Sequence, residues 1–122
     1  MKQILIENNR DSIIDRGWGN GYVLIPKHHP YWGKHYEDIP VTVHGGLTFG
    51  AHITNEKLDW FDELTKEDIG YYMVGFDTAH YGDDTYTCPK EYVIKETQSL
   101  HDQLKELNLT EKNLNIWKKK NG

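Results

Sequence analysis

The sequence is poor in arginine, and its overall charge is negative. Only Arg10 and Arg16 are arginines among its 14 basic residues, and the formal net charge is -5. A protein that binds polymeric nucleic acid needs clustered lysines and arginines to neutralise the phosphate backbone. We therefore expect no nucleic-acid polymer as a partner, whereas a small anionic ligand needs only one cation, a few backbone N–H groups and an aromatic face.

Cysteine is scarce as well, and long apolar runs are missing. The single cysteine, Cys88, excludes an intrachain disulfide and offers no zinc-ligand spacing. No stretch is long and apolar enough to span a bilayer, and the first residues turn polar after Ile6, too early for a signal peptide. We therefore expect a cytosolic protein with no membrane partner.

Aromatic residues are plentiful instead. The 122 residues include 4 tryptophans, 8 tyrosines and 3 phenylalanines, which supply large contact areas with polar tips. The length predicts one domain, residues 1–122, with a single core.

Short apolar stretches predict a mostly antiparallel sheet. We expect strands at residues 2–6, at residues 22–25 before Pro26, and at residues 71–76. A turn follows the first strand, with a helix cap at Asp11 or Ser12 and a brief helical turn through Asp15.

The middle of the chain gives weaker signals. Residues 27–40 follow Pro26 and contain Pro30 and Pro40, so they are expected to be irregular. Residues 41–44 and 47–53 have strand character, and Gly45-Gly46 between them predicts a kink, a bulge or a hairpin turn. Thr65 to Asp68 has the pattern of a capped turn.

A long helix is predicted after Pro89. Its apolar seam repeats at spacings of four and three residues, at Val93, Thr97, Leu100, Leu104 and Leu107. Residues 109–120 predict a second short helix, and an exposed Trp117 on this arm, residues 108–122, would favour contact with a second subunit. The fold expected is α+β: a mostly antiparallel sheet packed by a long C-terminal helix, with a short terminal helix and a homo-oligomeric assembly.

Seven histidines raise the question of a metal site. His44, His52, Asp77 and His80 are the natural ligand candidates, because imidazole and carboxylate groups bind zinc or manganese. The sequence has no HExxH helix and no CxxC pair, so hydrogen-bonded or surface histidines explain the pattern better. We predict no metal and no other cofactor.

Catalytic patterns are equally weak. Asp77 and His80 form an acid–base pair only if Thr78 and Ala79 make a turn, and otherwise Asp77 caps a turn with His80 packed at its edge. The sequence contains no serine or cysteine nucleophile motif and no GxxxxGK[ST] phosphate loop. We therefore predict a protein that is not an enzyme.

The same residues suit the binding of a nucleotide. Aromatic rings of Trp18, Tyr22 or Phe76 stack on a base, and Asp77 accepts hydrogen bonds from ribose hydroxyls or an exocyclic amine. In this interpretation the phosphates would be contacted by Arg16, His44 and the amides of Gly45 and Gly46. Two alternatives stay open, because Phe76 also suits the core and Arg16 also suits a solvated surface.

Three ordered motifs resemble a known family. The motifs are Arg16-Gly17-Trp18-Gly19-Asn20-Gly21-Tyr22-Val23, Val43-His44-Gly45-Gly46-Leu47-Thr48 and Gly75-Phe76-Asp77-Thr78-Ala79-His80, and the predicted helix from Glu91 to Leu107 follows them. Over about residues 13–107 the chain resembles the phage Thoeris anti-defence sponge family, type one.

The resemblance implies a function and a location. The protein would act in the cytoplasm of the infected bacterium, where it would capture the cyclic ADP-ribose isomer made by a TIR-domain enzyme and hold it intact. It would thereby prevent activation of the defence effector. The resemblance also implies a homodimer or higher oligomer and the binding of other cyclic nucleotides.

The ligand-binding residues expected within the matching stretches are Arg16, Trp18, Asn20, His44, Gly45, Gly46, Phe76, Asp77 and His80. Two alternative functions remain. One is an enzyme that hydrolyses a nucleotide signal with His44, Asp77 and His80, and the other is an inhibitor that binds a host protein through exposed aromatic side chains.

Overall fold

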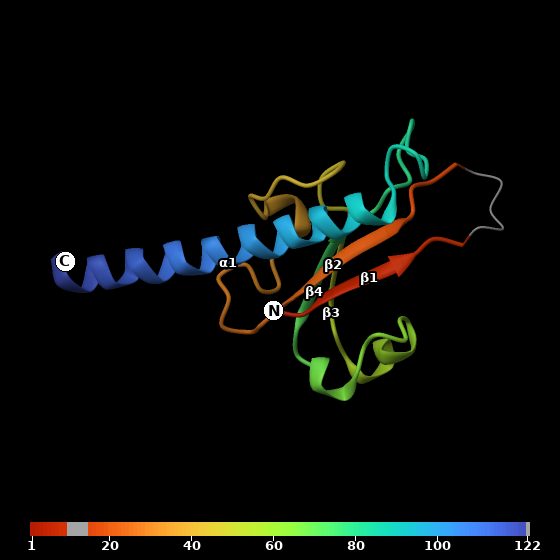
Figure 1. The fold of residues 1–122 in the computed structure, drawn as a ribbon. Coiled ribbons are helices and arrows are strands. Elements are labelled where there is room, and N and C mark those ends of the chain that lie inside the picture. Colours follow the sequence, from red (N-terminus) through yellow and green to blue (C-terminus); the bar gives the residue numbers. More distant parts are fainter. Residues whose placement is uncertain (10–14, 122) are drawn as a thin grey trace.

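The computed structural model describes residues 1–9 and 15–121, which form an α+β fold with a four-stranded antiparallel sheet and a long helix (Figure 1). The strand order across the sheet is β1-β2-β4-β3. The elements are β1 Gln3–Glu7, β2 Gly19–Ile25, β3 Phe49–His52, β4 Tyr72–Phe76 and α1 Lys90–Asn121, with short 3-10 helices η1 Tyr36–Asp38, η2 Asn55–Asp59 and η3 Lys66–Asp68 between them. The predicted antiparallel sheet and long C-terminal helix are confirmed.

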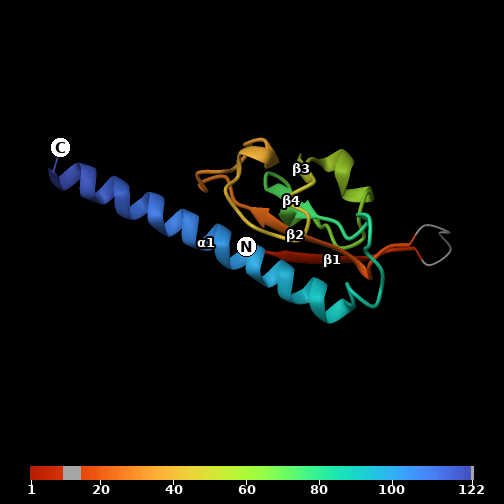
Figure 2. The same ribbon diagram turned by 90° about the horizontal axis from the view of Figure 1, so that it is seen from above.

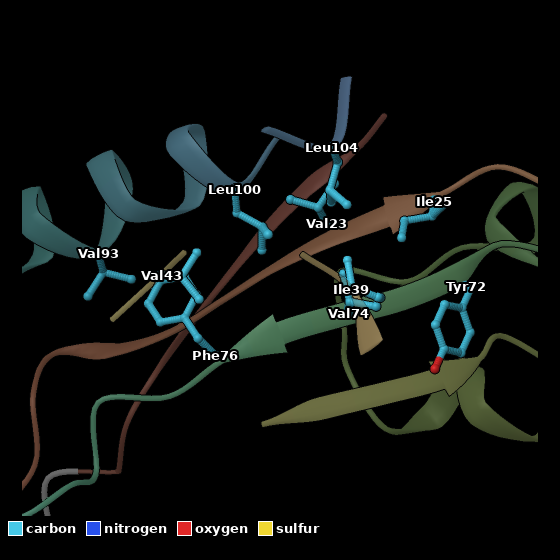
Figure 3. Packing of buried hydrophobic residues seen from close by; sticks show 10 residues of the cluster. All are labelled: Val23, Ile25, Ile39, Val43, Tyr72, Val74, Phe76, Val93, Leu100 and Leu104. Atoms are coloured by element: carbon cyan, nitrogen blue, oxygen red, sulfur yellow. The ribbon is translucent and has the colours of Figure 1, made fainter. Parts of the chain in front are cut away.

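The two central strands are buried because both faces of the sheet are covered. On the first face, Val23 of β2 and Val74 and Phe76 of β4 pack against Val93, Leu100 and Leu104 of α1 (Figure 3). These α1 positions recur at helical spacing and form the predicted seam, which lies across the sheet. The helix is therefore held by its first four turns.

The second face carries a separate apolar cluster. Tyr22 and Leu24 of β2 and Met73 of β4 alternate with the residues of the first face, and Ile53 and Leu64 from the connection between β3 and β4 cover them. The predicted capped turn lies in this connection, where the Asp68 carboxylate accepts a hydrogen bond from the Thr65 backbone N–H at 2.8 Å.

The prediction of two C-terminal helices is wrong, because α1 is continuous through residues 108 and 109. Neither glycine nor proline interrupts this part of the sequence. With 32 residues α1 is about 48 Å long, roughly twice the length of the longest strand. Its C-terminal portion therefore extends beyond the sheet (Figures 1 and 2).

Within the described residues, no helix combines the length and hydrophobicity needed to cross a bilayer.

The strand predicted at residues 41–44 is also wrong. This segment is not a strand, because side chains of α1 bind its backbone. Gln103 binds both backbone groups of Thr42: its side-chain oxygen accepts from the N–H and its amide donates to the carbonyl, each at 2.8 Å. The His44 N–H donates to the Glu96 carboxylate at 2.8 Å. Helix side chains thus take the place of a neighbouring strand, while Val43 is buried in the core.

His29 fixes the point at which α1 leaves the body of the protein. Its Nδ1 accepts a hydrogen bond from the Tyr31 N–H at 3.0 Å, so its Nε2 carries the proton and donates to the Leu104 carbonyl at 2.7 Å. Burial lowers the pKa of His29 below its ordinary value. The neutral ring therefore links the connection after β2 to the helix.

The predicted cap at Asp11 or Ser12 lies outside the described residues.

Candidate functional site

Parts of the three motifs converge at one end of the sheet. Antiparallel pairing of β2 with β4 aligns Gly21 with Phe76, so the start of β2 lies beside the end of β4. The Thr48 N–H donates to the Gly75 carbonyl at 2.9 Å, which brings the turn at Gly45 and Gly46 to the same end. The fold therefore explains why stretches far apart in sequence share one surface.

Backbone hydrogen bonds attach the loop between β4 and α1, residues 77–89, to the segment before β2. The Gly17 N–H donates to the Thr78 carbonyl at 2.7 Å, and the Trp18 N–H donates to the Cys88 carbonyl at 2.8 Å. The buried Thr78 hydroxyl donates to the Gly19 carbonyl at 2.7 Å. Both ends of the loop are thereby fixed to one short segment.

Asp83 is the centre of the polar contacts in this loop. Its carboxylate lies 3.0 Å from the His44 Nε2 and 3.2 Å from the His80 Nδ1, and it accepts from the His80 backbone N–H at 2.9 Å. Asp83 is 7% exposed. Burial acts to raise the pKa of this carboxyl, but the hydrogen bonds from His44 and His80 outweigh it and lower the pKa overall. Asp83 is therefore ionised at neutral pH.

His44 joins this carboxylate to α1. An ionised carboxylate only accepts, so the His44 Nε2 carries a proton, and in the neutral ring Nδ1 accepts from the Tyr92 hydroxyl at 2.8 Å. Burial, with the nearby Glu96 carboxylate, raises the pKa of Tyr92. His44 is thus oriented by groups on both sides of its ring.

Asp77 and His80 are brought together by the turn that their pairing requires. The Asp77 carboxylate accepts from the Ala79 N–H at 3.1 Å and lies 3.5 Å from the His80 Nδ1. Asp77 therefore caps a turn, and His80 makes the shorter of its two carboxylate contacts with Asp83. Asp77 therefore both caps the turn and lies beside the His80 imidazole, so the acid–base pair and the structural cap both remain possible roles.

A cleft of about 550 Å³ opens beside His80. Its volume lies in the range of small-molecule sites, and the side chain of Tyr81 beside it is fully exposed. Three aspartates make the cleft acidic. Its lining consists of Asp15, Ala79, His80, Tyr81, Gly82, Asp83 and Asp84.

Of the nine predicted ligand residues only His80 belongs to this lining. His44, Gly45, Gly46 and Asp77 lie close to the His80 ring, and the other four have different surroundings. Phe76 is 1% exposed in the core, which favours the packing role left open for it. The half-buried Trp18 ring lies 5.5 Å from the Lys90 Nζ. Asn20 points to the other face of the sheet and contacts the Tyr22 hydroxyl at 3.4 Å. Arg16 is half-buried and follows Asp15 of the cleft.

The two glycines of the second motif differ in their surroundings. Both have positive φ angles, 68° at Gly45 and 79° at Gly46. A Cβ atom on Gly45 would overlap the His80 ring, whereas one on Gly46 would meet no atom within 4 Å. The Gly46 N–H donates to the Val43 carbonyl at 2.9 Å, so Gly45 is the better candidate of the pair for an amide contact with phosphate.

Cys88 lies close to this cluster, with its Sγ 3.8 Å from the His44 Nε2 and 3.7 Å from an Asp83 oxygen. It is 1% exposed, and burial raises the pKa of its thiol, as does the Asp83 carboxylate. A neutral, buried thiol is a poor nucleophile. The arrangement indicates a structural role for Cys88.

Sequence reasoning missed Asp83 and Tyr92 as members of the site. Asp83 follows Gly82, whose φ of 88° allows the turn that returns its carboxylate to the His80 N–H. The sequence signal for this turn is Gly82 followed by Asp83, with Asp83 three residues after His80. Tyr92 gave no such signal, because its contact depends on how α1 packs.

Comparisons with protein-family models, curated proteins and solved structures find no match to this chain.

The contact between Gly45 and His80 gives a matched test of the site. Gly45→Ala and Gly46→Ala should each lose about 1–2 kcal/mol of folding stability, because both place a side chain at positive φ. Only Gly45→Ala should also displace the His80 ring, which nuclear magnetic resonance of the histidine side chains would detect. Equal effects of both variants on the His80 signals would contradict the described packing.

Proposed function

We propose that this protein binds and sequesters a cyclic ADP-ribose isomer without cleaving it, and so blocks TIR-based Thoeris immunity. One observation carries the proposal: the turn containing His44 and Gly45 and the segment Asp77 to His80 meet beside a cleft of about 550 Å³. These residues come from two of the motifs that resemble the sponge family. The third motif borders the same end of the sheet through its contacts with Thr78 and Cys88.

The cleft offers groups that suit the base and the riboses of such a ligand. The carboxylate of Asp84 in the cleft wall, and that of Asp77 next to His80, can accept hydrogen bonds from hydroxyl or amine groups. The exposed Tyr81 ring provides a stacking surface for a base. Recognition of this part of the ligand therefore needs no arginine.

The phosphates need a different part of the site, because the aspartates repel them. Arg16 follows the cleft residue Asp15, and Lys90 lies over Trp18 in the adjoining segment. We place the phosphates on this side, within reach of the two cations and with the Gly45 N–H as a further donor. The cations would then hold the phosphates on one side of the site, while the aspartates would face the base and the riboses.

Hydrolysis of the nucleotide is the second candidate function, and one observation favours it. His80 lies in the cleft wall with its Nδ1 3.2 Å from the Asp83 carboxylate, an arrangement that can orient an imidazole as a general base. Sequestration remains the stronger proposal, because the three motifs resemble a family that holds the nucleotide intact.

We further propose that the projecting part of α1 contacts a second copy of the chain. Its side chains are exposed from Leu109 onward, including Leu114, Ile116 and Trp117. An isolated helix of this length is marginal in water, and burial of these apolar groups would stabilise it.

Incubation with cyclic ADP-ribose, followed by removal of unbound ligand and heat denaturation, tests the main proposal. The released nucleotide should be intact. Asp77→Ala and Tyr81→Ala should each weaken capture by about tenfold or more, because each removes one recognition contact. Asp62→Ala removes an exposed carboxylate elsewhere and should leave capture unchanged.

A cleaved product would establish the hydrolytic alternative instead. If the protein captured no nucleotide, and the ligand left its thermal stability unchanged, the sequestration proposal would be overturned. A stoichiometric host protein recovered under those conditions would favour the protein-binding inhibitor.

The assembly proposal is tested by measuring particle mass in solution. Leu114→Lys combined with Trp117→Lys should lower the mass, because it places charge on the apolar surface of the arm. Asn115→Lys adds one charge to the same exposed part of α1 and should preserve the mass. A wild-type protein that sediments as a monomer would contradict the proposed contact.

A further inference from the structure

Three side chains from two separate segments place potential metal ligands close together. Each of His44, His80 and Asp83 offers one potential ligand atom, and these three atoms lie within 4.8 Å of one another. We propose that these residues bind one divalent transition-metal ion, with Zn²⁺ as the best match. This inference does not depend on the nucleotide that the cleft accepts, and it differs from the prediction of no metal made from the sequence.

The ligand types favour this class of ion. Two imidazoles and one carboxylate suit zinc and other divalent transition metals, whereas calcium and magnesium prefer oxygen ligands. In a tetrahedral zinc site, neighbouring ligand atoms are roughly 3.3 Å apart. The Asp83 carboxylate already lies 3.0 Å from the His44 Nε2 and 3.2 Å from the His80 Nδ1. The ligand atoms of the two imidazoles lie within 4.8 Å of each other, so the rings would move together by at most about 1.5 Å to hold the ion.

Each proposed ligand is oriented by a further contact. The His44 Nδ1 contacts the Tyr92 hydroxyl at 2.8 Å, and the His44 N–H is held by Glu96. The Asp83 N–H donates to the His80 carbonyl at 2.9 Å, while Gly45 packs against the His80 ring. Such outer contacts fix ring orientation at metal sites and strengthen metal binding.

Entry of the ion is possible from the cleft. The side chains of His80 and His44 are 38% and 20% exposed, whereas that of Asp83 is 9% exposed. The carboxylate therefore forms the base of the site and the imidazoles form its open side. Binding would require the proton of each neutral imidazole to move to its other ring nitrogen, from Nε2 to Nδ1 in His44 and from Nδ1 to Nε2 in His80. The His44 Nδ1–H would then donate to the Tyr92 hydroxyl.

Titration of the full chain with Co²⁺ tests the proposal. The protein should carry no histidine tag and should first be stripped of metal with a chelator. A visible absorption band should grow and saturate at one Co²⁺ per protomer, and Zn²⁺ should abolish it by displacement. His80→Gln should weaken binding by about tenfold or more, because it removes a half-exposed ligand.

The matched control is His28→Gln, which removes an exposed histidine outside the cluster and should bind Co²⁺ as the wild type does. Thermal unfolding in the presence of chelator checks that both variants remain folded. Lack of a saturable band in the wild type would overturn the proposal. Equal Co²⁺ affinity of His80→Gln and the wild type would do the same, and the cluster would then be a set of hydrogen bonds around Asp83.

Discussion

The ionised carboxylate of Asp83 holds together a part of the protein that has little apolar surface of its own. A buried charge is stable only when hydrogen bonds or opposite charges compensate its loss of hydration. Asp83 meets this requirement with contacts from His44 and His80, and His44 in turn contacts Tyr92 of α1. The loop after β4, the glycine turn and the helix therefore depend on one another.

The polar contacts around Asp83 lie at the end of a sheet whose two faces are packed with apolar side chains. The β2 and β4 strands are covered on both faces, and α1 is fixed to them by the seam that includes Leu100. Because the strands are antiparallel, the segment before β2 and the loop after β4 lie at the same end. The rigid sheet thus positions irregular segments that carry the candidate binding groups.

The sequence predicted the features that depend on local pattern, namely the three clearest strands and the start of the helix. It did not predict that Gln103 and Glu96 would replace a strand partner for residues 41–44, because these contacts join positions more than 50 residues apart. The site was partly predictable: His44 and His80 were selected and do meet. Asp83 was missed because its contact with His44 spans 39 residues and depends on the completed fold.

Recognition and assembly are proposed for opposite ends of the molecule, the cleft beside Asp83 and the projecting part of α1. The central claim is that the cleft end binds the nucleotide. Backbone nuclear magnetic resonance of the protein titrated with cyclic ADP-ribose tests this most directly. The account predicts saturable shifts concentrated in residues 16–20, 44–46 and 77–84. Saturable shifts confined to other parts of the chain, with these segments unchanged, would contradict it.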